Sequence, residues 1–163
     1  MLHFSPMEDR PTSIPSSESV RQAAEDAFAS GLYCAESVLS ALAAAQGVKS
    51  ELLPKVATAF CSGMARSCGP CGALTGALMG VGLALGRDDS SKSVQSAYAV
   101  TQELIRAFEH EFGARNCDEL LGCDLGTAEG QTKFKDERLY ERCRLYTGRT
   151  AEMAAQLLAP ALS

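Results

Sequence analysis

The chain has 163 residues, of which 46% are apolar and 21% charged, and its formal net charge is −5. These values describe one acidic globular domain, long enough to bury a core without disulfides or metals. The acidic balance, with neither Lys/Arg blocks nor a series of stacking aromatics, argues against binding to nucleic acid. Acidic residues and prolines stand at the start of the chain where a signal peptide would be basic and apolar, so we expect a cytoplasmic protein.

Helix formers dominate the composition. Alanine and leucine supply 44 residues, whereas valine and isoleucine supply nine, and this imbalance favours helix over sheet. We therefore expect an all-α fold, a single-domain bundle of about six to eight helices with no substantial sheet. This domain should cover residues 17–163, after a flexible, proline-rich tail over residues 1–16.

Apolar periodicity and capping residues predict the elements in chain order. The expected helices cover residues 17–30, 32–46, 50–64, 70–86 and 91–112, then a short turn at 116–121, and finally 131–146 and 151–158. Pro70 suits the first position of its helix, and Asn116 with Glu119 resembles a capping box. The uncharged stretch 67–86 is about as long as a membrane span, but proline and glycines dilute it, so we predict no membrane insertion.

Three glycines recur every four residues in the helix predicted over 70–86. Gly72, Gly76 and Gly80 would leave one helix face without side chains. Close packing against another helix is the commonest reason for such a stripe. Gly72 and Gly76 are also candidates for close approach of the backbone to a cofactor, and the stripe could pack against a second copy of the chain in a homodimer.

Seven cysteines are spread along the chain. They are Cys34, Cys61, Cys68, Cys71, Cys117, Cys123 and Cys143. In a reducing compartment, an odd number of cysteines indicates metal ligands, redox thiols or buried thiols rather than a disulfide framework. Cys34, Cys71 and Cys117 fall at predicted helix N-termini, where the helix dipole should lower the thiol pKa. Cys143 falls late in a predicted helix, where the dipole is unfavourable.

Cys68-Gly69-Pro70-Cys71 has the sequence of a thioredoxin-type active site. The surrounding sequence is not of that type, because the chain has no tryptophan and no convincing strand before the motif. Cys68 and Cys71 can nevertheless cycle between dithiol and disulfide without that fold, and they remain candidate catalytic redox thiols.

The chain has only two histidines, so a metal site would be built mainly from thiolates. Four cysteines select zinc or an iron–sulfur cluster among the common metals, and their spacing does not separate the two.

These residues together resemble the C_GCAxxG_C_C family of redox-active proteins. The most specific segment is Cys71-Gly72-Ala73-Leu74-Thr75-Gly76, which fits the family's CGAxxG element. The resemblance maps the family's four characteristic cysteines onto Cys34, Cys71, Cys117 and Cys143, and leaves Cys61, Cys68 and Cys123 as additions. It implies a small helical redox protein, and a related domain in split-Soret cytochromes is associated with an iron–sulfur centre.

The leading hypothesis is that these four cysteines bind an iron–sulfur cluster, most simply [2Fe–2S], for electron transfer or redox sensing with an unidentified partner protein. Thiol–disulfide chemistry at Cys68 and Cys71 is the first alternative. A structural zinc site and an interaction module with inert cysteines remain open. The sequence identifies no substrate and leaves open whether the protein is an enzyme.

Overall fold

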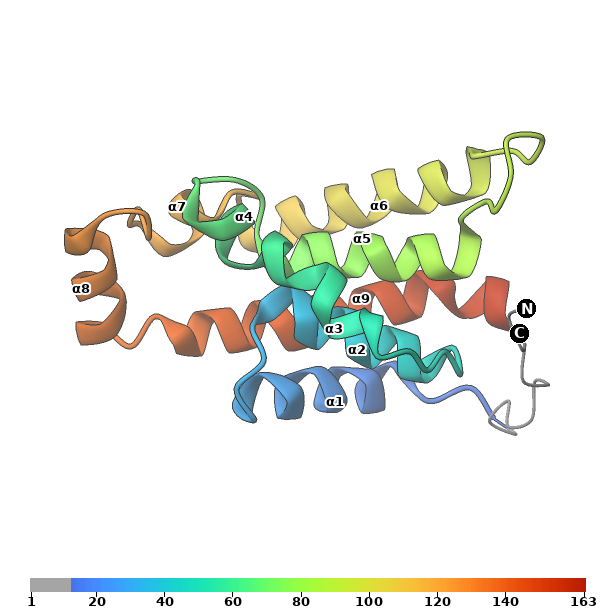
Figure 1. Ribbon diagram of the computed structural model, residues 1–163, viewed down its shortest axis with the longest axis horizontal. Coiled ribbons are helices and arrows are strands. Elements are labelled where there is room, and N and C mark those ends of the chain that lie inside the picture. The colour runs from blue at the N-terminus through green and yellow to red at the C-terminus, as the bar shows by residue number, and fades with distance from the viewer. Residues whose placement is uncertain (1–12) are drawn as a thin grey trace.

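The computed structural model describes residues 13–163 and is all-α, as the composition predicts. Four helices form the centre of the bundle: α1 (Ser17–Ala29), α2 (Cys34–Ala45), α5 (Gly72–Leu85) and α9 (Tyr140–Leu162). A fifth, α6 (Gln95–Phe112), packs on α5 and α9 (Figure 1). The core contains Leu39 of α2, Leu74 of α5 and Phe108 of α6, all fully buried. Large apolar side chains removed from water supply most of the stability of such a bundle.

Most of the shorter elements gather at one end of the bundle, whereas the first of them packs on α2 nearer the middle (Figure 1). They are α3 (Leu52–Ala57), the 3₁₀ turn η1 (Thr58–Phe60), α4 (Cys61–Arg66), α7 (Cys117–Leu121) and α8 (Ala128–Asp136). Pro70 and Asn116 form an isolated antiparallel bridge there, and the part of the chain that the structure describes has no strand. No helix in residues 13–163 is long and apolar enough to cross a membrane.

Helix ends follow the predicted stop signals in the first half of the chain. Gly31 and Gly47 lie just beyond α1 and α2 with φ values of +112° and +71°, a region that glycine enters without a steric penalty. Ser16 caps α1, because its hydroxyl accepts a hydrogen bond from the Ser19 N–H at 3.1 Å. The predicted tail over residues 1–16 lies mostly outside the described residues.

The helix predicted over residues 50–64 is wrong beyond Ala57. After α3 and η1, the backbone turns left-handed through α4, where Ser62, Gly63, Met64 and Ala65 have φ values between 52° and 64°. The apolar residues that suggested one continuous helix belong instead to α3, η1 and α4. Three of them, Val56, Phe60 and Met64, are exposed. Apolar periodicity alone does not reveal a reversal of helix hand, since the side-chain spacing is similar in both.

The predicted boundary between the last two helices, expected between residues 146 and 151, is also wrong. The chain breaks near Arg138, which has a φ of +53°, and α9 then continues without interruption from Tyr140 to Leu162. Gly148 lies inside α9 and packs against the Glu25 side chain of α1, so this glycine serves close packing and does not end the helix. As a result Cys143 lies in the first turn of α9, and its predicted position late in a helix is wrong.

Two predicted helix starts also differ. Pro70 is not the first residue of a helix, because α5 begins at Gly72 with Cys71 as its cap. Asn116 precedes α7, but its side chain makes no capping hydrogen bond to the α7 backbone and instead donates to Glu119 Oε1 at 3.2 Å. The predicted capping box is therefore absent, although Asn116 does mark the start of the short helix.

Candidate redox site

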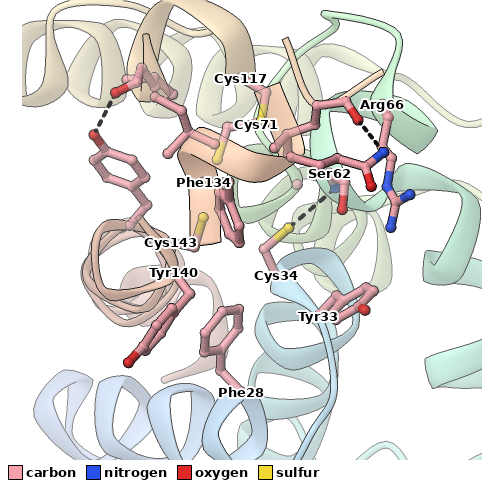
Figure 2. Close-up of a pocket in the computed structure, with 16 residues that line it drawn as sticks. Phe28, Tyr33, Cys34, Ser62, Arg66, Cys71, Cys117, Phe134, Tyr140 and Cys143 are labelled. Carbon is pink, nitrogen blue, oxygen red and sulfur yellow. Dashed lines mark hydrogen bonds between the residues drawn. The ribbon is translucent and has the colours of Figure 1, made fainter. Parts of the chain in front are cut away.

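The four cysteines that the family resemblance selects all line one pocket. Cys34, Cys71, Cys117 and Cys143 surround a cavity of about 280 Å³ at the end of the bundle that carries the short helices (Figure 2). They come from α2, the cap of α5, α7 and α9, so folding assembles them from four separate parts of the chain. The other three cysteines are absent from the lining.

Each of these cysteines lies at the N-terminal end of a helix. Cys34 is the first residue of α2, Cys71 caps α5, Cys117 begins α7, and Cys143 is in the first turn of α9. Backbone N–H groups at such ends lack partners within the helix and carry partial positive charge. These helix ends therefore place partial positive charge near the pocket cysteines.

A short backbone ladder ties Cys71 to Cys117. The Cys71 N–H donates a hydrogen bond to the Arg115 carbonyl at 2.8 Å, and the Cys117 N–H donates to the Gly69 carbonyl at 2.9 Å. These bonds flank the bridge between Pro70 and Asn116. The segment that carries the CxxC motif is thus held against the start of α7, which fixes two of the four cysteines relative to each other.

The left-handed turn of α4 lies between Cys34 and Cys117. The Ser62 N–H donates to Cys34 Sγ at 3.5 Å (Figure 2). A Cβ added to Gly63 would lie 2.5 Å from the Cβ of Cys117. Several consecutive non-glycine residues in this conformation cost roughly 1–2 kcal/mol each. Such strain persists only where the surrounding structure enforces it, and here the strained turn contacts two of the pocket cysteines.

Aromatic and aliphatic side chains make up most of the remaining lining. Five rings contribute to the pocket wall: Phe28, Tyr33, Phe134, Tyr140 and Tyr146. Arg66 adds a cation to the lining. Tyr146 also stacks edge-to-face on Phe112, with ring centroids 4.8 Å apart, and its hydroxyl donates to the Leu120 carbonyl at 3.2 Å. The pocket wall is therefore continuous with the core of the bundle.

The sequence-based expectation of lowered thiol pKa values is wrong for Cys71 and Cys117. Burial raises the pKa of Cys71 from 9.0 to about 12, even though the N–H groups of Ala73 and Leu74 pull in the opposite direction. Burial likewise raises the pKa of Cys143 to about 12 and that of Cys117 to about 11. Desolvation disfavours a lone thiolate more than the helix ends favour it, so these thiols are protonated at neutral pH.

The CxxC pair is divided between two environments. Cys71 is buried in the pocket wall, whereas Cys68 is partly exposed outside it, with Asp124 and Asp118 as its charged neighbours. Desolvation and the Asp124 carboxylate raise the pKa of Cys68. All seven cysteines are free thiols. Neither thiol of the motif is therefore activated as a nucleophile in this conformation.

The glycine stripe packs against α2. A Cβ on Gly76 would lie 2.5 Å from the Ala35 carbonyl oxygen, and one on Gly80 would lie 2.5 Å from Leu42 Cδ1. Gly72 lies against Cys34 and lines the pocket, whereas Gly76 does not. The stripe thus serves close helix packing, and Gly72 alone of the two candidate cofactor contacts lies at the pocket.

The pocket cysteines do not form a ready site for a single metal ion. Within residues 13–163, no three side chains of His, Cys, Asp or Glu are arranged to hold one metal ion. A mononuclear zinc site needs four donors within about 2.3 Å of one point. The four pocket cysteines are instead distributed around a cavity of about 280 Å³.

Sequence reasoning missed Cys61 and the aromatic wall. Cys61 is buried beside Cys34, and the Cys34 side chain is the neighbour that most strongly raises its pKa. No spacing rule pairs these two residues, because the left-handed turn that brings them together has no sequence signature. The five lining aromatics come from four different parts of the chain and show no common period.

Comparisons with known proteins agree with the cysteine pattern. No curated protein and no solved structure matches the chain. The sequence does match the family described as "Putative redox-active protein (C_GCAxxG_C_C)" over residues 32–157, which is more than half of its length. That range includes all four pocket cysteines and the stripe of α5. The chain therefore belongs to the C_GCAxxG_C_C family.

Proposed function

We propose that Cys34, Cys71, Cys117 and Cys143 together bind an iron–sulfur cluster of the [2Fe–2S] type, which serves electron transfer or redox sensing. The observation that carries this proposal is the convergence of these four thiols, and of no other cysteine, on one pocket. When bound, such a cluster supplies one-electron chemistry whose potential depends on charge, hydrogen bonds to sulfur and exposure.

The backbone around the pocket suits a centre with net negative charge. Four thiolates bring four negative charges, and the N-terminal ends of α2, α5 and α9 direct partial positive charge toward them. The Ser62 N–H donates to the Cys34 sulfur, and a hydrogen bond of this kind stabilises electron density on a ligating sulfur. The half-buried rings of Phe28, Phe134 and Tyr146 make part of the lining aromatic, whereas Tyr33 and Tyr140 are exposed.

Binding must be coupled to proton release. Because the pKa values of Cys71, Cys117 and Cys143 are raised, the free thiols hold their protons at neutral pH, whereas metal ligation requires thiolates. Occupation of the pocket therefore releases these protons and stabilises the fold at the same time. A site of free thiols suits a reducing compartment such as the cytoplasm, and electron transfer requires a redox partner protein.

Substitution of Cys117 tests the proposal, with Cys123 as the matched control. Cys117 lines the pocket, whereas Cys123, six residues later, does not. Cys117→Ser should abolish the visible absorbance and lower bound iron and acid-labile sulfide at least tenfold, while Cys123→Ser keeps all three. Unchanged iron and an unchanged spectrum in Cys117→Ser would contradict the assignment. One colourless zinc per chain in the wild type would replace the cluster with a structural zinc site.

A further inference from the structure

Cys61 is a buried thiol that the proposed cluster does not use. It is 3% exposed and lies against Cys34, the pocket cysteine at the start of α2. Its thiol is 3.6 Å from the Ala57 carbonyl, to which it donates a hydrogen bond. Apart from this weak bond, the Cys61 thiol interacts with the Cys34 sulfur.

The geometry around Gly72 shows how near the two cysteines are. A Cβ on Gly72 would lie 3.0 Å from the Cys61 Cα and closer still to the Cys34 Sγ, so both cysteines border the space that this glycine leaves. Disulfides form between residues whose Cα atoms are about 4.4–6.8 Å apart. A Cys34–Cys61 disulfide would have to meet this spacing, and the two residues already border the same glycine.

The two thiols differ in access. Cys34 lines the pocket, and its sulfur accepts the Ser62 N–H at 3.5 Å. Cys61 is buried behind it and is absent from the lining. A small oxidant entering the pocket therefore meets Cys34 first, and Cys61 is placed to react with whatever forms there.

We infer that Cys34 and Cys61 are a redox pair, in which a hydroperoxide oxidises Cys34 and Cys61 then closes a disulfide with it. In the first step the Cys34 sulfur attacks the peroxide, the O–O bond breaks, and Cys34 sulfenic acid and water (or an alcohol) form. In the second, the protonated Cys61 thiol gives its proton to the sulfenic oxygen as its sulfur attacks Cys34, so that water leaves and the S–S bond forms. The pair loses two electrons and two protons, which the peroxide takes up, and a dithiol reductant reverses the change.

This pairing has a consequence for the pocket that rests on the proposed function. A disulfide occupies the Cys34 sulfur, so the pocket loses one of its four cysteine ligands. The oxidised protein should then fail to take up iron until a dithiol reduces it. The disulfide itself requires no metal, and it is tested in metal-free protein so that the two proposals can fail separately.

Tryptic mapping identifies the pair directly. Cleavage after lysine and arginine places Cys34 in peptide 22–49, Cys61 in peptide 56–66, and both Cys68 and Cys71 in peptide 67–87. Reduced, metal-free full-length protein is treated with hydrogen peroxide, alkylated and digested without reductant. The expected product is peptide 22–49 linked to peptide 56–66. A disulfide confined to peptide 67–87, or no link to peptide 56–66, would overturn the inference.

Two variants separate the steps, and circular dichroism checks that each is folded. Cys61→Ser should stop at the sulfenic acid, which dimedone labels on peptide 22–49, whereas Cys123→Ser should form the same disulfide as the wild type. Equal dimedone labelling of wild type and Cys61→Ser would contradict a resolving role for Cys61.

If the disulfide forms in a protein that never binds iron, the inference stands and the proposed cluster fails. If the cluster forms but the disulfide does not, the proposed cluster stands and the inference fails.

Discussion

Gly76 of α5 lies directly against the backbone of Ala35 in α2. A Cβ at position 76 would be 2.5 Å from the Ala35 carbonyl oxygen and 2.8 Å from its Cα. Because backbone atoms cannot move aside as a flexible side chain can, this contact sets how closely α2 and α5 approach. Cys34 and Cys71 lie at the N-terminal ends of these same helices, so the contact also sets the separation of two pocket cysteines.

Gly76→Ala should therefore destabilise the protein. The overpacking costs about 1–3 kcal/mol, which exceeds the gain of about 1 kcal/mol that alanine brings to a helix interior. Gly82→Ala is the control in the same helix, because a Cβ there meets nothing within 4 Å; it should stabilise by about 0.5–1 kcal/mol. Urea denaturation of the metal-free proteins measures both changes. A stabilising Gly76→Ala would contradict the packing of α2 on α5.

The stripe also shows what sequence reasoning could and could not supply. Glycines at four-residue spacing predicted a close helix contact, and the family resemblance selected the four cysteines that share the pocket. The sequence could not show that α4 is left-handed, because Met64 and Ala65 are ordinary right-handed helix formers and tertiary contacts override that preference. It also misplaced Cys143, because the break near Arg138 has neither glycine nor proline to mark it.

The left-handed turn predicts an unusual response to glycine. Ala65 is exposed with a φ of 57°, so Ala65→Gly removes a steric penalty of about 1–2 kcal/mol while loosening the unfolded chain. We expect a net gain in stability of up to about 1 kcal/mol. The same substitution at Ala99, exposed in the right-handed helix α6, should instead cost about 1 kcal/mol. Equal losses at the two positions would show that residue 65 is right-handed.

The buried thiols make the metal-free protein sensitive to alkali. The folded-state pKa values of Cys71 and Cys143 are raised from 9.0 to about 12, so the folded state holds these protons more tightly than the unfolded state does. The associated stability is complete below pH 9 and is lost as the pH rises toward 12. Urea denaturation with reductant present should give a free energy of unfolding that falls steadily above pH 9.

Cys71→Ser provides the comparison for the pH profile. Serine does not ionise in this range, so the variant should lose stability less steeply with pH than the wild type, whatever its stability at neutral pH. The slope, and not the absolute stability, carries the test. A wild-type profile that is flat or rising between pH 9 and 11 would show that these thiols are not buried as described.

The most direct test of the cluster is the metal content of the wild-type protein after anaerobic purification. Iron, zinc and acid-labile sulfide are measured per chain together with the ultraviolet–visible spectrum. The proposal predicts a brown protein with iron and sulfide in equal amounts and absorbance that disappears in Cys117→Ser. A colourless protein that binds neither iron nor sulfide, even after anaerobic reconstitution with both, would contradict it.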